Sequence, residues 1–177
     1  MATTSEVIAR IAGKTRRVAS RLAGDVGIVA TLKEERQAIL SLLHQIPRSF
    51  DGPGDGKRAH ALCARLRAEI SAHANAEERT IYSTLIELDE TDELAAKALA
   101  EHDVLAWKLE QLLRVDARSS HHSKLLDEIE QDLREHIDSE ENRLLQFAAK
   151  AFSKTKLEQL ESEFLREKRL QYQARKR

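Results

Sequence analysis

Hydrophobic residues recur at intervals of three and four positions along most of the chain, a pattern that predicts amphipathic α-helices. The four longest runs of this pattern cover residues 28–46, 58–88, 92–115 and 122–152. Pro47 ends the first run, and the stretch 48–57 that follows holds three glycines and a proline, which marks a loop. Because the later connections are short, we expect the helices to pack as antiparallel neighbours in an up-down-up-down four-helix bundle.

A basic amphipathic segment precedes this bundle. Residues 5–22 combine Val, Ile and Leu with Arg and Lys, which predicts a short helix. The same Arg-rich, acid-poor composition is also typical of a mitochondrial transit peptide, which is the alternative interpretation. The predicted organisation is therefore an N-terminal helix in residues 1–24, the bundle in residues 25–152 and a charged helix in residues 153–177.

The C-terminal segment predicts a last, highly charged helix over residues 153–172. Leu157 and Phe164 lie on its modest apolar face, and Thr155 with Glu158 can form a capping box at its start. We expect this helix to pack on the outside of the bundle or against another subunit.

Polar residues interrupt the apolar stripes of three predicted helices. His73 and Glu77, and again His136 and Glu140, stand four residues apart at positions where the stripe calls for Leu, and His102 lies at the centre of a third stripe. An unpaired buried carboxylate costs several kcal/mol unless a cation or hydrogen bonds compensate it. The pattern therefore predicts a metal site inside the bundle, with these five residues as its ligands.

Composition supports an all-α protein of one domain. The chain has 177 residues, helix-forming residues dominate it, and it has only 6 Gly and 2 Pro, which makes β architecture a poor fit. The single cysteine, Cys63, excludes an internal disulfide and a multi-cysteine zinc motif, and it is compatible with a reducing compartment. No stretch approaches the roughly 20 apolar residues of a membrane span, and the N-terminus lacks an apolar signal core. We expect a soluble, cytoplasmic protein.

Charge is unevenly distributed, although the formal net charge is only -1 at pH 7. Residues 1–23 carry five basic groups and one acidic group, residues 154–177 carry eight basic and four acidic, and the section between them is left at about −9. Solvated helix faces are the simplest explanation. The alternatives are docking of the basic ends within the chain, or a protein, polyanion or membrane surface as partner; a homo-oligomer is also compatible with the sequence.

Imidazole and carboxylate ligands together suit iron, manganese or zinc, and carboxylates can bridge two ions. Ferritin-like di-iron proteins place Glu before His in a Glu-x-x-His motif, whereas here His precedes Glu by four residues. The motifs HANAEE, EHD and HIDSEE resemble those of the hemerythrin-like HHE cation-binding family, over about residues 26–150. The resemblance implies a non-haem di-iron centre in a four-helix bundle, with Glu77 and Glu140 as bridging carboxylates and the histidines as terminal ligands.

One position departs from that family. In LKEERQAIL, Arg36 stands where the first histidine of the family is expected, and Arg cannot be a metal ligand. Three arrangements are open: two metals with water or Glu35 completing the ligand set, one metal held by the remaining five ligands, or a metal-free bundle. In the last, the Arg36 guanidinium replaces a cation and pairs with Glu77 or Glu140.

Members of the family carry or sense dioxygen, sense iron, respond to nitric oxide or oxidative stress, or assist iron–sulfur cluster repair. The resemblance therefore implies a protein that holds one or two iron ions and binds or senses dioxygen, nitric oxide or peroxide in a stress response. The alternative is a metal-free regulatory or scaffold bundle, and an enzyme ranks third. Other residues have simpler interpretations: we expect Tyr82 and Trp107 to serve as packing, and His60, His121 and His122 to be exposed.

Overall fold

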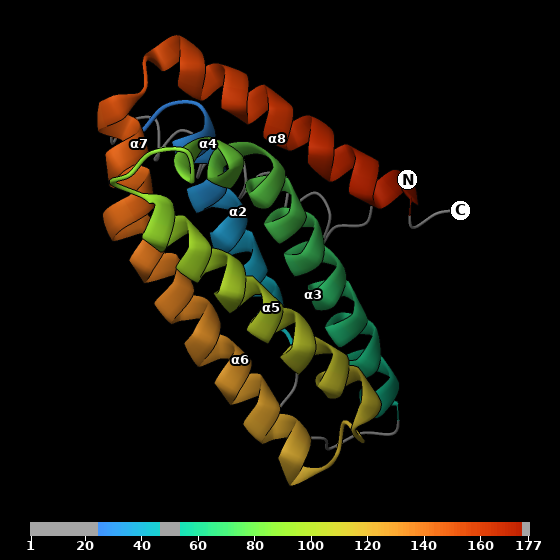
Figure 1. Cartoon of the computed structure of the whole chain (residues 1–177). Helices are drawn as coiled ribbons and strands as arrows, with labels where there is room; N and C mark the ends of the chain where they lie inside the picture. Colours follow the sequence, from blue (N-terminus) through green and yellow to red (C-terminus); the bar gives the residue numbers. More distant parts are fainter. Residues whose placement is uncertain (1–24, 47–53, 175–177) are drawn as a thin grey trace.

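The computed structural model describes residues 25–46 and 54–174, and every regular element in these ranges is helical (Figure 1). The chain is all-α, as the sequence predicts. Four long helices form an antiparallel bundle: α2 (Ile28–Leu43), α3 (Asp55–Glu77), α5 (Asp92–Arg114) and α6 (Ser120–Ser139). Within the described ranges no helix is both long and apolar enough to span a bilayer.

Two of the long helices change their winding near one end of the bundle. The π-helical turn η1 (Glu78–Tyr82) joins α3 to the short α4 (Ser83–Leu85), and η2 (Glu140–Leu144) joins α6 to α7 (Leu145–Ala151). The sequence predicted each of these stretches as one continuous α-helix, which is wrong at the two turns. A π turn accommodates one extra residue, and the spacing of apolar residues alone does not reveal it.

Other boundaries differ by a few residues. The helix predicted over 28–46 ends at Leu43, and the one predicted from residue 58 already begins at Asp55. The helix α8 (Lys154–Ala174) is capped by Ser153, whose hydroxyl accepts a hydrogen bond from the Lys156 amide at 3.2 Å, so the predicted capping box at Thr155 is wrong. The predicted N-terminal helix lies outside the described residues.

The last helix, α8, packs on the bundle itself, against α2 and α3 (Figure 1). Its apolar face is buried, and Phe164 is completely enclosed. Thr31 of α2 donates a hydrogen bond to Glu161 at 2.6 Å, and near the other end of α8 the Tyr172 hydroxyl donates to Glu69 of α3. This helix therefore extends the bundle core from four helices to five.

The core consists of two apolar clusters. One includes Leu66 of α3 and Leu109 of α5, and the other includes Ile81 of η1 and Phe164 of α8. A layer of buried polar side chains lies between the two clusters. It consists of Arg36, His73, Glu77, His102, His136 and Glu140.

The start of α2 is held against the start of α8 by a glycine. Gly27 has φ of 57°, which lies in the left-handed region, and a Cβ placed on it would lie 2.5 Å from the backbone carbonyl carbon of Leu157. Backbone cannot yield as a side chain can, so only glycine satisfies both the conformation and the close approach.

Gly27→Ala should therefore lower the free energy of unfolding by at least about 2 kcal/mol, because it adds both a strained φ and a backbone clash. Chemical denaturation monitored by circular dichroism measures this. Gly56→Ala is the matched control, since its Cβ would meet only Arg118 Nε at 3.8 Å, and it should leave stability unchanged or slightly higher. Equal denaturation midpoints for the two variants would contradict this account of the α2–α8 junction.

Candidate metal centre

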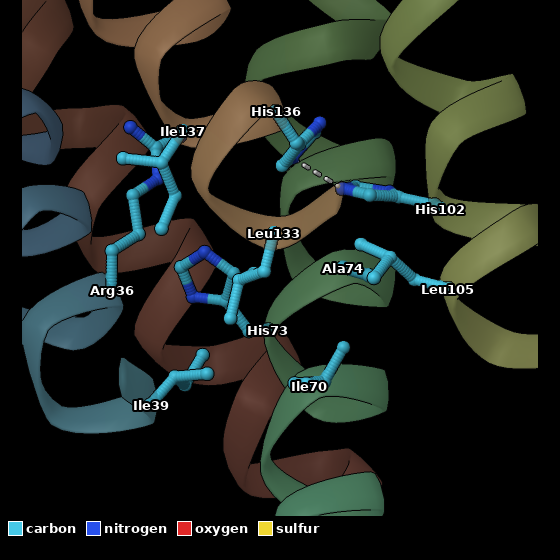
Figure 2. A pocket seen from close by; sticks show the side chains of 10 residues that line it. All are labelled: Arg36, Ile39, Ile70, His73, Ala74, His102, Leu105, Leu133, His136 and Ile137. Atoms are coloured by element: carbon cyan, nitrogen blue, oxygen red, sulfur yellow. Dashed lines mark hydrogen bonds between the residues drawn. The ribbon is translucent and has the colours of Figure 1, made fainter. Parts of the chain in front are cut away.

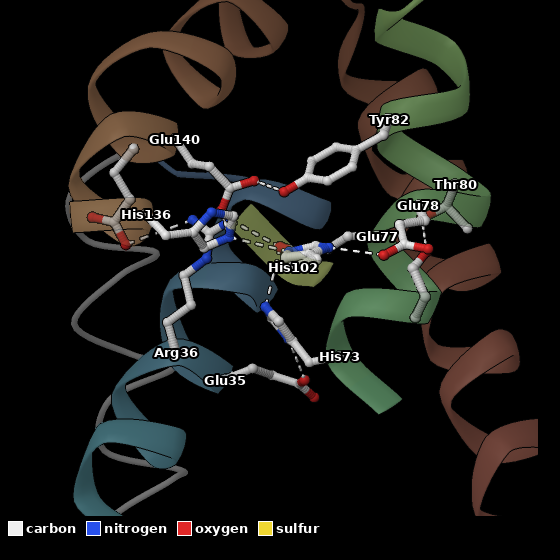
Figure 3. A network of polar contacts seen from close by, with 12 residues as sticks. Glu35, Arg36, His73, Glu77, Glu78, Thr80, Tyr82, His102, His136 and Glu140 are labelled. Carbon is white, nitrogen blue, oxygen red and sulfur yellow. Dashed lines mark hydrogen bonds and ion pairs between the residues drawn. The ribbon is translucent and has the colours of Figure 1, made fainter. Parts of the chain in front are cut away.

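The structure brings the five sequence-predicted site residues together at one depth of the bundle. His73 and Glu77 come from α3, His102 from α5, and His136 and Glu140 from the junction of α6 and η2. All five are buried, with at most 6% of any residue exposed, and their side chains converge between the helices (Figure 3). The i, i+4 spacing places each His–Glu pair one turn apart on the inward face of its helix.

Three of these side chains form a particularly close group. The Nε2 atoms of His102 and His136 lie 3.2 Å apart, and His102 Nε2 lies 3.4 Å from Glu77 Oε2. Ligand atoms of these three residues all lie within 4.8 Å of one another, a spacing that one metal ion can span. The remaining two members lie beside the group, with His73 Nε2 3.1 Å from Glu77 Oε1 and His136 Nε2 3.1 Å from Glu140 Oε2.

A second set of carboxylates fixes the orientation of the three imidazoles. Each histidine has its Nδ1 atom within 2.8–3.1 Å of a glutamate oxygen on another helix. The pairs are His73 with Glu35, His102 with Glu78, and His136 with Glu101. An ionised carboxylate can only accept a hydrogen bond, so Nδ1 carries the proton and the Nε2 lone pair of His102 and of His136 faces the interior. Carboxylates behind the imidazoles are typical of metal-binding histidines.

Glu78 and Glu101 were not among the site residues predicted from the sequence. Both are adjacent to predicted ligands, because Glu78 follows Glu77 and Glu101 precedes His102. That adjacency is the one signal in the sequence. Each glutamate serves the histidine of a neighbouring helix, and this pairing depends on how the helices are rotated against each other.

Arg36 of α2 lies at the centre of the polar layer and is 1% exposed. Its Nη2 atom donates to Glu77 Oε1 at 2.8 Å and also to Glu140 Oε2. Burial lowers the pKa of Arg36, but the charges of Glu140 and Glu77 outweigh burial and raise it, so the guanidinium stays charged. Burial raises the pKa of Glu77, but His73 and Arg36 outweigh burial and hold it well below its usual range. The pairing anticipated for Arg36 is thus present with both carboxylates.

Tyr82 takes part in the centre beyond packing. Its hydroxyl donates a hydrogen bond to Glu140 Oε1, and its ring stacks on His102 with centroids 5.5 Å apart. Burial, together with the charges of Glu77 and Glu140, raises the pKa of Tyr82 well above its usual value, so the phenol keeps its proton. The π turn η1 ends at Tyr82, and its extra residue changes which side chain reaches the interior.

Two other sequence-based expectations are wrong. Trp107 is 61% exposed and does not pack in the core, because the buried face of α5 passes through Leu105 and Leu109 and leaves Trp107 on the opposite side. His122, expected to be exposed, is buried in the first turn of α6 with Nε2 3.6 Å from Cys63 Sγ. His60 and His121 are exposed, as expected.

Comparison with known proteins agrees with this geometry. The sequence pattern of the hemerythrin HHE cation-binding domain matches residues 27–148, which is more than half of the chain. The chain belongs to this family. The predicted family is therefore confirmed.

A solved hemerythrin structure shares the fold. The crystal structure of the Rv2633c homologue from Mycobacterium kansasii, a hemerythrin HHE cation-binding domain-containing protein, aligns with a TM-score of 0.71 and 23% sequence identity. The alignment covers 85% of this chain and 90% of that one. No curated protein matches the chain in sequence.

The hemerythrin donor set fits a bound cation. The His102 and His136 lone pairs face each other at 3.2 Å, an arrangement that is repulsive unless a metal ion or a proton lies between them. Glu77 Oε2 is buried and has no hydrogen-bond donor among the described residues. Buried lone pairs without partners cost free energy, and a cation coordinated by these atoms would satisfy all three.

A small cavity lies beside the imidazoles of His73, His102 and His136 (Figure 2). Its volume is about 10 Å³, which is enough for one water-sized molecule. Arg36, His73, His102 and His136 line it on the polar side. Its other walls are apolar and consist of Ile39, Ile70, Ala74, Leu105, Leu133 and Ile137.

A proton can replace the cation when the hemerythrin centre is metal-free. Burial lowers the pKa of His136, but hydrogen bonds to Glu101 and Glu140 outweigh it and raise the pKa to about 9. The hydrogen bond from His136 in turn lowers the pKa of Glu101 to about 2. Since the folded-state pKa of His136 exceeds its ordinary value of 6.5, its protonation stabilises the fold fully below pH 6.5. That contribution is lost as the pH rises through 9.

The metal-free protein should therefore lose stability between pH 6.5 and 9, by roughly 3 kcal/mol from His136. Urea denaturation of chelator-treated protein at a series of pH values measures the slope. His136→Gln removes the titrating group and should flatten this part of the profile. If the variant and the original chain show the same pH dependence, the imidazolium is not the source of the effect.

Proposed function

We propose that this hemerythrin-like protein binds non-haem iron in the polar layer and uses it to bind or sense dioxygen, nitric oxide or peroxide in a stress response. The five residues predicted from the sequence, His73, Glu77, His102, His136 and Glu140, surround the site. The observation that carries the proposal is the convergence, inside an apolar interior, of two imidazole lone pairs and a carboxylate oxygen that has no donor among the described residues.

The chemistry of the donors favours iron. Two histidines and one carboxylate on one side of an ion, with positions left open, are the ligand set of many non-haem Fe(II) sites. Manganese and zinc accept the same donor types. Iron is the choice among them that also binds dioxygen and nitric oxide through its open positions, since zinc has no redox chemistry.

The surroundings suit a small ligand. The cavity beside the imidazoles is water-sized and mostly apolar, so it is too small for an organic substrate. Tyr82 and Arg36 supply hydrogen-bond donors within the same layer. A site of this size supports sensing or binding of a small molecule better than turnover of a larger one.

The proposal places the protein in the cytoplasm, where its single cysteine, Cys63, stays reduced. The basic residues of 1–23 and 154–177 are the natural contact for a protein or polyanion partner that would receive the signal. Self-association is a further route for such a signal.

Protein loaded with Fe(II) under nitrogen should retain iron through desalting and should gain a visible absorption band when nitric oxide is added. His102→Ala should lose both properties because it removes one of the two facing imidazoles. His44→Ala is the matched control, since His44 is an exposed histidine that pairs with Glu130 at 2.9 Å, outside the polar layer. Protein that remains colourless and metal-free by elemental analysis would rule out the iron proposal.

One observation favours a second candidate function. The Arg36 guanidinium already bonds both Glu77 and Glu140, which is the arrangement expected of a metal-free regulatory bundle. In that case the basic terminal segments would carry the function, and the layer would serve only as buried ion-pair structure.

Arg36→Met separates the two candidates. It should destabilise metal-free protein by about 3–5 kcal/mol, because the buried carboxylates lose their cation. If the protein binds iron, adding Fe(II) to the variant should recover most of that loss, because the metal supplies positive charge to the same oxygens. Thermal unfolding with and without Fe(II) is the measurement, and a melting temperature that does not respond to Fe(II) in either chain would favour the metal-free candidate.

A further inference from the structure

We infer that Arg36 acts as a permanent second cation, so that this centre takes one metal ion, held by Glu77, His102 and His136. This inference rests on the proposed function, because it concerns the number and position of the ions in the same layer. It departs from the two-ion centre that the sequence resemblance implies.

Three of the four carboxylate oxygens of Glu77 and Glu140 accept hydrogen bonds, and one is left for a metal ion (Figure 3). Glu77 Oε1 and Glu140 Oε2 both accept hydrogen bonds from Arg36 Nη2, and Glu140 Oε1 accepts one from the Tyr82 hydroxyl. Glu77 Oε2 is the remaining oxygen of the two side chains, and it has no hydrogen-bond donor among the described residues. That free oxygen is the one that faces His102 Nε2.

The position of this free oxygen places the ion on the side of the polar layer that faces α5 and α6. Glu77 Oε2 lies next to the facing lone pairs of His102 and His136, and these three residues are the ones whose ligand atoms share a 4.8 Å neighbourhood. Each oxygen of Glu140 already accepts a hydrogen bond, from Arg36 or from Tyr82, so a metal ion bridged by Glu140 would have to compete with these two donors.

His73 lies on the other side, next to the guanidinium. Its nearest carboxylate oxygen at the centre is Glu77 Oε1, at 3.1 Å, and that oxygen already accepts from Arg36. Its ligand atoms are not part of the group formed by Glu77, His102 and His136, whose ligand atoms all lie within 4.8 Å of one another. We therefore assign His73 as a positioning residue for Glu77 and not as a ligand of the ion.

Electrostatics opposes a second ion while Arg36 is in place. An ion bridging Glu77 and Glu140 would have to share the two oxygens that the guanidinium occupies, within a few ångströms of a fixed positive charge in a dry interior. One divalent ion together with Arg36 already exceeds the negative charge of the two carboxylates. A second would add two more positive charges, which the partly exposed Glu35, Glu78 and Glu101 behind the imidazoles offset only in part.

Metal stoichiometry tests the inference. The original chain and its variants are loaded with Fe(II) under nitrogen, desalted, and measured for iron per chain by elemental analysis and for affinity by titration against a competing chelator. We expect one iron in the original chain and two in Arg36→His, which exchanges the cation for an imidazole. Arg36→Lys, the charge-conserving control, should keep one.

A second pair of variants does not depend on changing Arg36. His102→Ala should abolish retention of iron, whereas His73→Ala should weaken affinity by no more than about 10-fold, as expected of a residue behind a ligand. Circular dichroism confirms that each variant is folded. Equal loss of iron in these two variants would overturn the assignment of His73.

The outcomes separate this inference from the proposed function. Two irons in the original chain, or one iron in a folded Arg36→His variant, would overturn the role of Arg36 while leaving an iron protein. No iron in any chain would overturn the proposed function and this inference with it. Iron in Arg36→His but none in the original chain would show that Arg36 blocks the site completely, which also contradicts a single-ion centre.

Discussion

Two carboxylates, Glu77 and Glu140, are buried at the same depth of the bundle, and the organisation of the centre follows from the positive charge that they require. Isolated carboxylates cannot stay ionised in an apolar interior without cations or several hydrogen bonds. Arg36 supplies a fixed charge, Tyr82 supplies a neutral donor, and the imidazoles supply either protons or coordination for a metal ion. Metal loading and protonation are therefore competing solutions to one electrostatic problem.

Much of the fold could be predicted from the sequence because the fold depends on periodicity. The stripes through Leu66, Leu105 and Leu133 identify which face of each helix is buried, and a histidine on such a stripe must then lie inside. Contacts between side chains of different helices are harder to predict from the sequence, because they depend on how each helix is rotated and shifted along its axis relative to its neighbours. For that reason Glu78 and Glu101 could not be matched with His102 and His136 beforehand.

For Arg36, the residue type was enough to predict an ion pair but not the number of metal ions beside it. Its place on the α2 stripe and its planar, permanently charged head predict a buried pair with a carboxylate. The sequence left open whether that pair replaces one ion, two ions or none. The answer depends on which oxygen atoms of Glu77 and Glu140 already accept hydrogen bonds. The sequence names the two residues, but only the structure shows the contacts of each oxygen.

The two π turns bear on how relatives of this chain should be compared. The first begins directly after a His–Glu motif, at Glu78, the second begins at Glu140, the last residue of the other motif, and each adds a residue to its turn. A helical wheel drawn through either motif with a constant 100° step thus misplaces every residue beyond the turn, Tyr82 included. Where a relative has an uninterrupted α-helix, its alignment with this chain needs a one-residue gap at the π turn. Equivalent positions beyond the turn then differ by one residue in number.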